Sequence, residues 1–257
     1  MTQNESGTVP AGELNGKVAV VTGGSRGLGR EMIRAFAARG ADVVIASRKI
    51  ENCRELADEV SNEFGVSALP VRCNVSVWEE CDDLVDAAYG HFDRVDILVN
   101  NAGLSPLYPD LESVSPELFD KVIGVNLRGP FRLMASIGSR MATGEGGSII
   151  NIGSVEAIRP RGLALPYAAA KAGLHVLSEG FAQSLGPKVR VNTIQAGAFL
   201  TDISENWPAG LREELVAATA LARCAEANEI VGAAIFFATS ASSFATGAVL
   251  RYDGGFR

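Results

Sequence analysis

The sequence places Thr22-Gly23-Gly24-Ser25-Arg26-Gly27-Leu28-Gly29 directly after the apolar run KVAVVT (17–22) and at the start of a segment with helical periodicity (28–39). Glycines at positions 23, 27 and 29 permit a tight turn and a close approach of the backbone to a phosphate group. The positive end of the following helix would attract that phosphate. Such a turn can also simply connect a strand to a helix, but its position after the first apolar run favours a dinucleotide site.

Short apolar runs alternate with longer amphipathic segments along the chain. The runs predicted to be strands are 17–22, 42–46, 68–72, 96–100, 148–152, 189–194 and 248–253. The segments predicted to be helices are 28–39, 50–64, 78–92, 116–142, 166–185 and 226–239. Repeated units of strand, helix and strand indicate a parallel sheet covered by helices on both faces. The predicted fold class is therefore α/β, a doubly wound Rossmann fold with a seven-stranded, mainly parallel sheet.

The 257 residues contain no linker rich in proline, glycine or serine and no internal repeat. This length is compatible with one large α/β domain, which we assign to residues 15–257. Residues 1–14 are mostly polar and are predicted to be a flexible N-terminal tail. The segment 198–221 follows a predicted strand but contains none, so we expect it to be a lid over the substrate.

Composition excludes several classes of protein. The formal net charge of −7 and the absence of a Lys/Arg-rich run argue against binding to nucleic acid or to an anionic membrane. The start of the chain lacks a signal-peptide pattern and the apolar run 231–238 is too short to span a bilayer, so we expect a cytoplasmic protein. Two histidines and four cysteines without a Cys-x-x-Cys pair predict no metal site and thiols of a reducing compartment. The cysteines are Cys53, Cys73, Cys81 and Cys224.

The end of the second predicted strand carries information about the cofactor. An NAD site usually has a carboxylate there for the adenosine ribose, but this chain has Ser47, Arg48 and Lys49. Together with Arg26, these cations supply positive charge where the 2′-phosphate of NADP would lie. They can also be ordinary solvated charges, but the missing carboxylate favours NADP(H) over NAD(H).

Tyr167 and Lys171 are separated by four positions in a predicted helix, so their side chains lie on the same face about one turn apart. A nearby ammonium lowers the pKa of a phenol from its reference value near 10. The same spacing is common on helix surfaces. Ser154 and the run Asn100-Asn101-Ala102-Gly103, however, each follow a predicted strand, so they belong to the same edge of the sheet as the glycine turn.

From about residue 16 to residue 255, these motifs resemble the short-chain dehydrogenase/reductase family, in its TGxxxGxG and YxxxK subgroup. The resemblance implies that Tyr167 is the catalytic acid/base and that Lys171 binds the nicotinamide ribose and lowers the tyrosine pKa. It implies that Ser154 hydrogen-bonds the substrate oxygen. Asn126 matches the asparagine that kinks the long helix and holds a water for proton relay.

The resemblance also implies a set of cofactor-binding positions. They are Gly23, Ser25, Arg26, Gly27, Leu28, Gly29, Ser47, Arg48, Lys49, Asn74, Val75, Asn101, Ala102, Gly103, Tyr167, Lys171, Gly197 and Thr201. Two positions depart from the family pattern. Gln195-Ala196-Gly197 stands where the family usually has Pro-Gly, and Asn74 replaces the usual aspartate.

Within the family, the chain most resembles 3-oxoacyl-(acyl-carrier-protein) reductases and related ketone reductases. The implied reaction is hydride transfer between NADP(H) and a carbonyl or secondary alcohol, with a 3-oxoacyl group or another hydrophobic ketone as substrate. Candidate wall residues are mostly apolar: Leu104, Pro106, Leu107, Tyr108, Ala157, Leu163, Phe199 and Trp207. Arg159 and Arg161 are interpreted as solvated loop charges rather than contacts to an anionic substrate.

Several alternatives stay open. Of the two arginines typical of carrier-protein reductases, Arg132 is present but Gln183 occupies the second position, which leaves a carrier-protein partner uncertain. Other substrate classes are steroids, polyols and sugar alcohols, and a different class of protein would be a catalytically silent NADP sensor. The helices 116–142 and 166–185 resemble those of the family's subunit interface, which implies a homotetramer.

Overall fold

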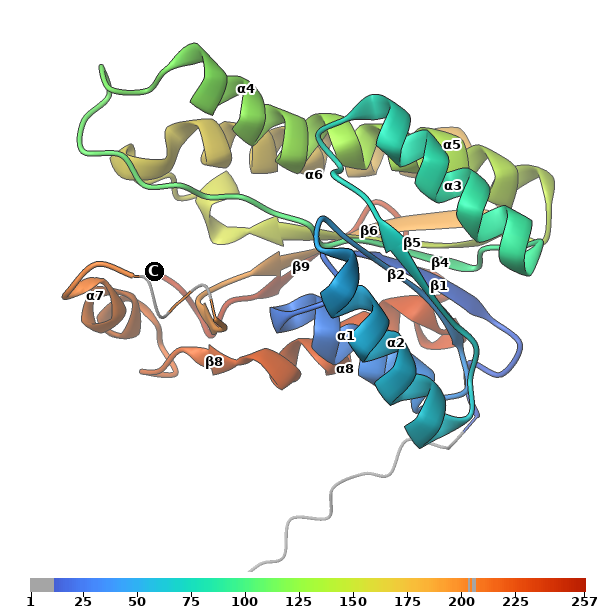
Figure 1. Ribbon diagram of the computed structural model, residues 1–257. Coiled ribbons are helices and arrows are strands. Elements are labelled where there is room, and N and C mark those ends of the chain that lie inside the picture. Colours follow the sequence, from blue (N-terminus) through green and yellow to red (C-terminus); the bar gives the residue numbers. More distant parts are fainter. Residues whose placement is uncertain (1–11, 203, 205–206) are drawn as a thin grey trace, which may run out of the picture.

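The computed structural model describes residues 12–202, 204 and 207–257, and its centre is a seven-stranded parallel sheet (Figure 1). The strands lie in the order β3-β2-β1-β4-β5-β6-β9, and all pairs are parallel. They are β1 Val18–Thr22, β2 Asp42–Ser47, β3 Ala68–Arg72, β4 Ile97–Asn100, β5 Gly147–Ser154, β6 Val189–Ala196 and β9 Val249–Tyr252. The predicted doubly wound fold is confirmed.

Helices cover both faces of the sheet (Figure 1). They are α1 Gly27–Ala37, α2 Ile50–Phe64, α3 Trp78–Phe92, α4 Pro116–Ile123, α5 Gly129–Thr143, α6 Leu165–Leu185, α7 Leu211–Ala218 and α8 Ile230–Ala238. Alternate residues of β1 point to opposite faces: Val21 packs with the helices α1, α2 and α8, and Val20 packs with α3, α5 and α6. Burial on both faces explains why β1 is continuously apolar.

The predicted helix 116–142 is interrupted in its middle. A five-residue π-helical turn, Gly124–Arg128, separates α4 from α5. Asn126 lies inside this turn, and its Nδ2 donates to the carbonyls of Leu104, at 2.8 Å, and Val122, at 2.9 Å. Its Oδ1 accepts from the backbone N–H of Leu104 at 3.2 Å. The widened turn therefore lets a buried side chain hold the loop after β4.

Two expectations differ from the structure. The segment 198–221 was expected to lack a strand, but Phe199–Leu200 forms β7, which pairs with β8, Ala225–Glu226. A two-residue strand is too short to produce a recognisable alternation in the sequence. Residues 1–11 of the expected flexible tail lie outside the described residues, whereas Leu14 is buried and its N–H donates to the carbonyl of Arg39 at 3.0 Å.

Within the part of the chain that the structure describes, no helix is long and apolar enough to cross a membrane.

Candidate active site

A cleft of about 350 Å³ opens at the carboxyl ends of the strands, where the strand order reverses between β1 and β4. This is the position at which doubly wound sheets bind their ligands. Most predicted site residues line it: Gly23, Ser25, Arg26, Gly27, Leu28, Ser47, Arg48, Asn74, Val75, Asn101, Ala102, Gly103, Ser154, Tyr167, Lys171, Gly197 and Thr201. The structure thus brings both the proposed catalytic and the proposed cofactor residues to one cavity.

Three predicted site residues do not line the cleft. Gly29 is a packing position, because a Cβ there would lie 2.2 Å from the carbonyl oxygen of Gly23. Lys49 is exposed at the start of α2 and lies outside the cleft. Asn126 lies behind the cleft wall. It hydrogen-bonds the backbone of Leu104, and Leu104 lines the cleft.

The structure also adds residues to the cleft wall. Nine residues line the cleft although no sequence motif marked them as site residues: Cys73, Ser105, Val125, Ile152, Gly153, Ala196, Ala198, Asp202 and Ser204. Many of them adjoin motif residues in the chain, but their identity follows no pattern in the sequence. Of the apolar wall candidates, Leu104, Phe199 and Trp207 line the cleft, and the remaining five do not. Tyr108 instead joins two loops, since its hydroxyl donates to Gly162 O and accepts from Leu165 N, both at 2.8 Å.

The glycine turn has the geometry of a phosphate cradle. Gly23 and Gly27 have φ angles of +62° and +50°, which disfavour any side chain. A Cβ at Gly23 would also lie 2.9 Å from Nδ2 of Asn101. The N-cap residue of α1, Arg26, makes no side-chain capping bond, so the first N–H groups of this helix have no cap from it. These features fit the pyrophosphate of a dinucleotide.

The run after β4 fixes this turn in place. Asn101 Nδ2 donates to the carbonyls of Thr22 and Gly23, at 2.9 and 3.1 Å. The Thr22 hydroxyl accepts in return from the N–H groups of Asn101 and Ala102, both at 3.1 Å. The Ser25 hydroxyl bonds that of Ser47 at 3.0 Å, which ties the turn to the end of β2. The phosphate cradle is therefore held in its shape by hydrogen bonds within the chain.

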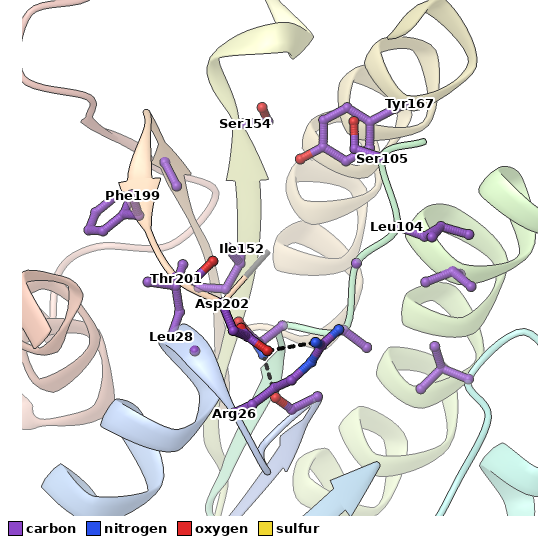
Figure 2. Close-up of a pocket in the computed structure, with 18 of the residues that line it drawn as sticks. Arg26, Leu28, Leu104, Ser105, Ile152, Ser154, Tyr167, Phe199, Thr201 and Asp202 are labelled. Atoms are coloured by element: carbon purple, nitrogen blue, oxygen red, sulfur yellow. Dashed lines mark hydrogen bonds and ion pairs between the residues drawn. The ribbon is translucent and has the colours of Figure 1, made fainter. Parts of the chain in front are cut away.

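The three predicted cations occupy different environments. Arg26 forms an ion pair with Asp202, with 2.6 Å between Nη1 and Oδ2, and both residues line the cleft (Figure 2). Arg48 lines the cleft and is exposed, and no described residue forms an ion pair with it. Lys49 lies outside the cleft. Of the three, Arg48 is thus the cation that both lines the cleft and has no ion-pair partner among the described residues. The carboxylate of Asp202 belongs to no motif in the sequence.

Ser154 and Tyr167 lie together at the other end of the cleft (Figure 2). Ser154 ends β5, and its Oγ accepts from the N–H of Glu156 at 3.1 Å. Lys171 lies one turn after Tyr167 in α6 and is only 3% exposed. Its Nζ donates to the carbonyl of Ile152 at 2.7 Å and lies 5.7 Å from the centroid of the Tyr167 ring. The phenol, the hydroxyl and the ammonium are thereby held on rigid elements.

Burial dominates the acid–base properties of this end of the cleft. It lowers the pKa of Lys171 to about 8. It also raises the pKa of Tyr167, and the hydrogen bond with Ser154 acts in the opposite direction. The resemblance implied a tyrosine pKa lowered by Lys171, but in the protein alone desolvation is the larger effect. The positive charge of an oxidised nicotinamide, when bound, would favour the phenolate.

Three arginines lie outside this set and differ in their contacts. Arg161 donates from its backbone N–H to the buried carboxylate of Glu156 at 2.8 Å, and its Nε contacts the same carboxylate. Arg161 is therefore a loop anchor rather than a solvated charge, while Arg159 is exposed. Arg132 donates to Asp82 at 2.5 Å and lies 4.9 Å from the Trp78 ring centroid, so α3 holds its guanidinium.

A parallel doubly wound sheet with a phosphate cradle, and with a phenol and an ammonium at its carboxyl edge, defines a dinucleotide-dependent oxidoreductase. The family model described as Enoyl-(Acyl carrier protein) reductase matches residues 23–257. The L-rhamnose 1-dehydrogenase (NAD(P)(+)) of Azotobacter vinelandii is 35% identical, over 93% of this chain and 96% of its own length. The 3-oxoacyl-[acyl-carrier-protein] reductase FabG of Thermotoga maritima is 32% identical, over 94% and 98%.

A solved structure agrees with these relatives. The blue fluorescent protein from a metagenomic library, in complex with NADPH, has a TM-score of 0.88 and 34% identity, covering 95% of this chain and 99% of its own. The chain belongs to the short-chain dehydrogenase/reductase family. It is accordingly an oxidoreductase of alcohol or ketone substrates that uses a nicotinamide cofactor.

Proposed function

We propose that the protein is an NADP(H)-dependent oxidoreductase that interconverts a hydrophobic ketone and its secondary alcohol, with Tyr167 as the acid/base. The observation that carries this proposal is the placement of Ser154, Tyr167 and Lys171 at one end of the cleft whose other end contains the phosphate cradle. When bound, NADPH supplies the hydride for the carbonyl carbon. The protein then has to orient the carbonyl and protonate its oxygen.

The local hydrogen bonds support this division of roles. The Ser154 Oγ accepts from the N–H of Glu156, which fixes its position beside Tyr167, and its hydroxyl proton is the group that we assign to the substrate oxygen once the substrate lies between the two side chains. Tyr167 donates the proton to that oxygen in the direction of reduction and takes it back in oxidation. Lys171, held by the carbonyl of Ile152, faces the phenol ring and stabilises the phenolate when it forms.

The preference for NADP(H) rests on Arg48 and on the absence of a carboxylate at the end of β2. Replacing Arg48 with aspartate removes a phosphate partner and introduces an acceptor for a ribose hydroxyl. We expect the ratio of kcat/KM for NADPH to that for NADH to fall by about a hundredfold. The matched control is Lys49→Asp, which makes the same charge change outside the cleft and should leave the ratio nearly constant. An Arg48→Asp ratio equal to that of the wild type contradicts the assignment.

The apolar wall supports a hydrophobic substrate. Leu104, Phe199 and Trp207 line the cleft together with Ser154 and Tyr167. A polyol or sugar would require more hydrogen-bonding groups on this wall. Coenzyme-A-linked 3-oxoacyl groups and simple ketones fit it better, whereas the engaged Arg132 gives less support to docking of a carrier protein.

A substrate panel tests this proposal. NADPH consumption should be measured with 3-oxoacyl thioesters, aliphatic and cyclic ketones, and steroids, and NADP⁺ reduction with polyols and sugars. We expect turnover with ketones or 3-oxoacyl thioesters and little with polyols. Turnover confined to sugars would contradict the proposed ketone substrate and would indicate a sugar dehydrogenase. Tight NADPH binding without any turnover would indicate a silent sensor.

We also propose that the protein assembles as a homotetramer. The helices α4, α5 and α6 expose large apolar side chains, among them Phe119, Phe131 and Val176. Side chains of this kind gathered on neighbouring helices are typical of subunit interfaces. Light scattering should give about four times the chain mass of 26.9 kDa. A monomer mass at micromolar concentration would rule this assembly out.

A further inference from the structure

A buried charge that the proposed reaction does not use lies next to Ser154. The side chain of Glu156 is only 7% exposed, and Glu156 lies outside the set of residues that line the cleft. Its backbone N–H donates to the Ser154 Oγ at 3.1 Å, so the position of Glu156 determines where the serine oxygen is held. A carboxylate is rarely buried to this extent unless it is paired. Glu156 therefore needs partners inside the protein.

Both oxygens of the Glu156 carboxylate are bound by one residue, Arg161. The backbone N–H of Arg161 donates to Oε2 at 2.8 Å, and its Nε donates to Oε1. The Arg161 side chain is 34% exposed, so the negative member of this ion pair is the one that lies inside the protein. The two hydrogen bonds have fixed directions, and they close the chain between residues 156 and 161 into a loop.

A second pair of hydrogen bonds continues from this loop to the start of α6. The carbonyl of the next residue, Gly162, accepts from the Tyr108 hydroxyl, which accepts in turn from the N–H of Leu165, both at 2.8 Å. Leu165 is the first residue of α6, and Tyr167 follows two positions later. Side-chain hydrogen bonds thus hold the segment that connects Ser154 to Tyr167, the two hydroxyls at one end of the cleft (Figure 2).

We propose that Glu156 is a positioning residue that fixes the Ser154 hydroxyl relative to the Tyr167 phenol. This inference rests on the proposed function, in which both hydroxyls meet the substrate oxygen. An apolar side chain would fill the same space at a lower cost of burial, but it would leave the N–H of Arg161 without its acceptor. The carboxylate sets direction as well as distance, and a small misplacement of a catalytic group lowers kcat strongly.

Replacing Glu156 with glutamine tests this role. The amide has the same size but only one acceptor oxygen, so one of the two bonds from Arg161 is lost. We expect kcat for ketone reduction to fall about tenfold, while the Kd for NADPH stays within about twofold of the wild type. Arg161→Gln removes the Nε donor from a more exposed position and should give a loss of similar size. The matched control is Arg159→Gln, which makes the same charge change at an exposed position of the same loop and should keep the wild-type kcat.

A double-mutant cycle measures whether Glu156 acts through Ser154. Ser154→Ala removes the hydroxyl that Glu156 holds, so adding Glu156→Gln to that variant should change kcat by less than about twofold. A further loss of about tenfold in the Ser154→Ala background would mean that Glu156 acts independently of the serine, and the proposal would be wrong. Wild-type kcat in Glu156→Gln, or an equal loss in Arg159→Gln, would overturn it as well.

Hydrogen exchange gives a readout that needs no turnover. In the cofactor-free protein, Glu156→Gln and Arg161→Gln should each speed the exchange of amides in the segment 155–165 by about tenfold, while β1 exchanges at the wild-type rate. Wild-type exchange in this segment contradicts the proposal, and faster exchange in β1 as well would indicate a general loss of stability instead of a local role. If the wild type turns over no substrate, the proposed function fails, and the exchange rates alone decide whether Glu156 holds the loop.

Discussion

Replacing Tyr167 with phenylalanine should lower kcat by about a thousandfold or more, while the Kd for NADPH stays within about twofold of the wild type. The substitution removes only the hydroxyl. The ring remains beside the ammonium of Lys171 and keeps its packing in α6, so the cleft keeps its shape. Stopped-flow turnover and fluorescence titration measure the two quantities separately.

The matched control is Tyr89→Phe. Its hydroxyl is also buried, has no hydrogen-bond partner among the described residues and lies outside the cleft. Its kcat should equal that of the wild type. Wild-type turnover in the Tyr167 variant, or an equal loss in the Tyr89 variant, would remove Tyr167 from the acid/base role.

The pH profile gives a second measurement on the same residue. Burial raises the pKa of Tyr167 in the free protein, so its phenol stays protonated through neutral pH. The kcat/KM for ketone reduction, which needs the phenol as donor, should therefore be flat through neutral pH and fall on the alkaline side. Alcohol oxidation, which needs the phenolate, should rise over the same alkaline range. Both changes should be absent from the residual activity of Tyr167→Phe.

The strands of the sheet could be predicted from the sequence because each of them is marked by its own run of apolar residues. Val20 and Val21 are buried on opposite faces, and such strands form continuous apolar runs that need no knowledge of distant residues. The motif residues could also be assigned to one edge, since parallel strands end at the same edge of a sheet. The strand β7 escaped prediction because only its pairing with β8 defines it.

The site was less predictable where a residue's role depends on its partner. Arg26 carries the expected charge, but its ion pair with Asp202 joins residues 176 positions apart. Tyr108 was expected to line the cleft because it is a large aromatic residue near Leu104, but its hydroxyl instead joins two loops. No spacing in the sequence indicates such contacts. Lys171 is a further example, because its position predicts proximity to Tyr167 but not the degree of its burial.

That burial has a measurable thermodynamic effect. The pKa of Lys171 is about 8 in the folded protein and near 10.4 in an unfolded chain. Between these values the unfolded state binds more protons, so the free energy of unfolding rises with pH from about pH 8 to about pH 10. The difference of about 2.5 pH units corresponds to about 3 kcal/mol.

Replacing Lys171 with methionine should remove this rise. Urea unfolding of the cofactor-free protein, compared at pH 7 and pH 10.5, should show the wild type gaining about 3 kcal/mol relative to Lys171→Met. Lys49→Met, at an exposed position outside the cleft, should follow the wild type. Equal pH dependence in all three proteins would mean that Lys171 is solvated in the folded state. The buried Lys171 ammonium destabilises the free protein at neutral pH, but the same ammonium stabilises a phenolate at Tyr167. At pH 7 the Lys171→Met variant should therefore be more stable than the wild type and should also lose turnover.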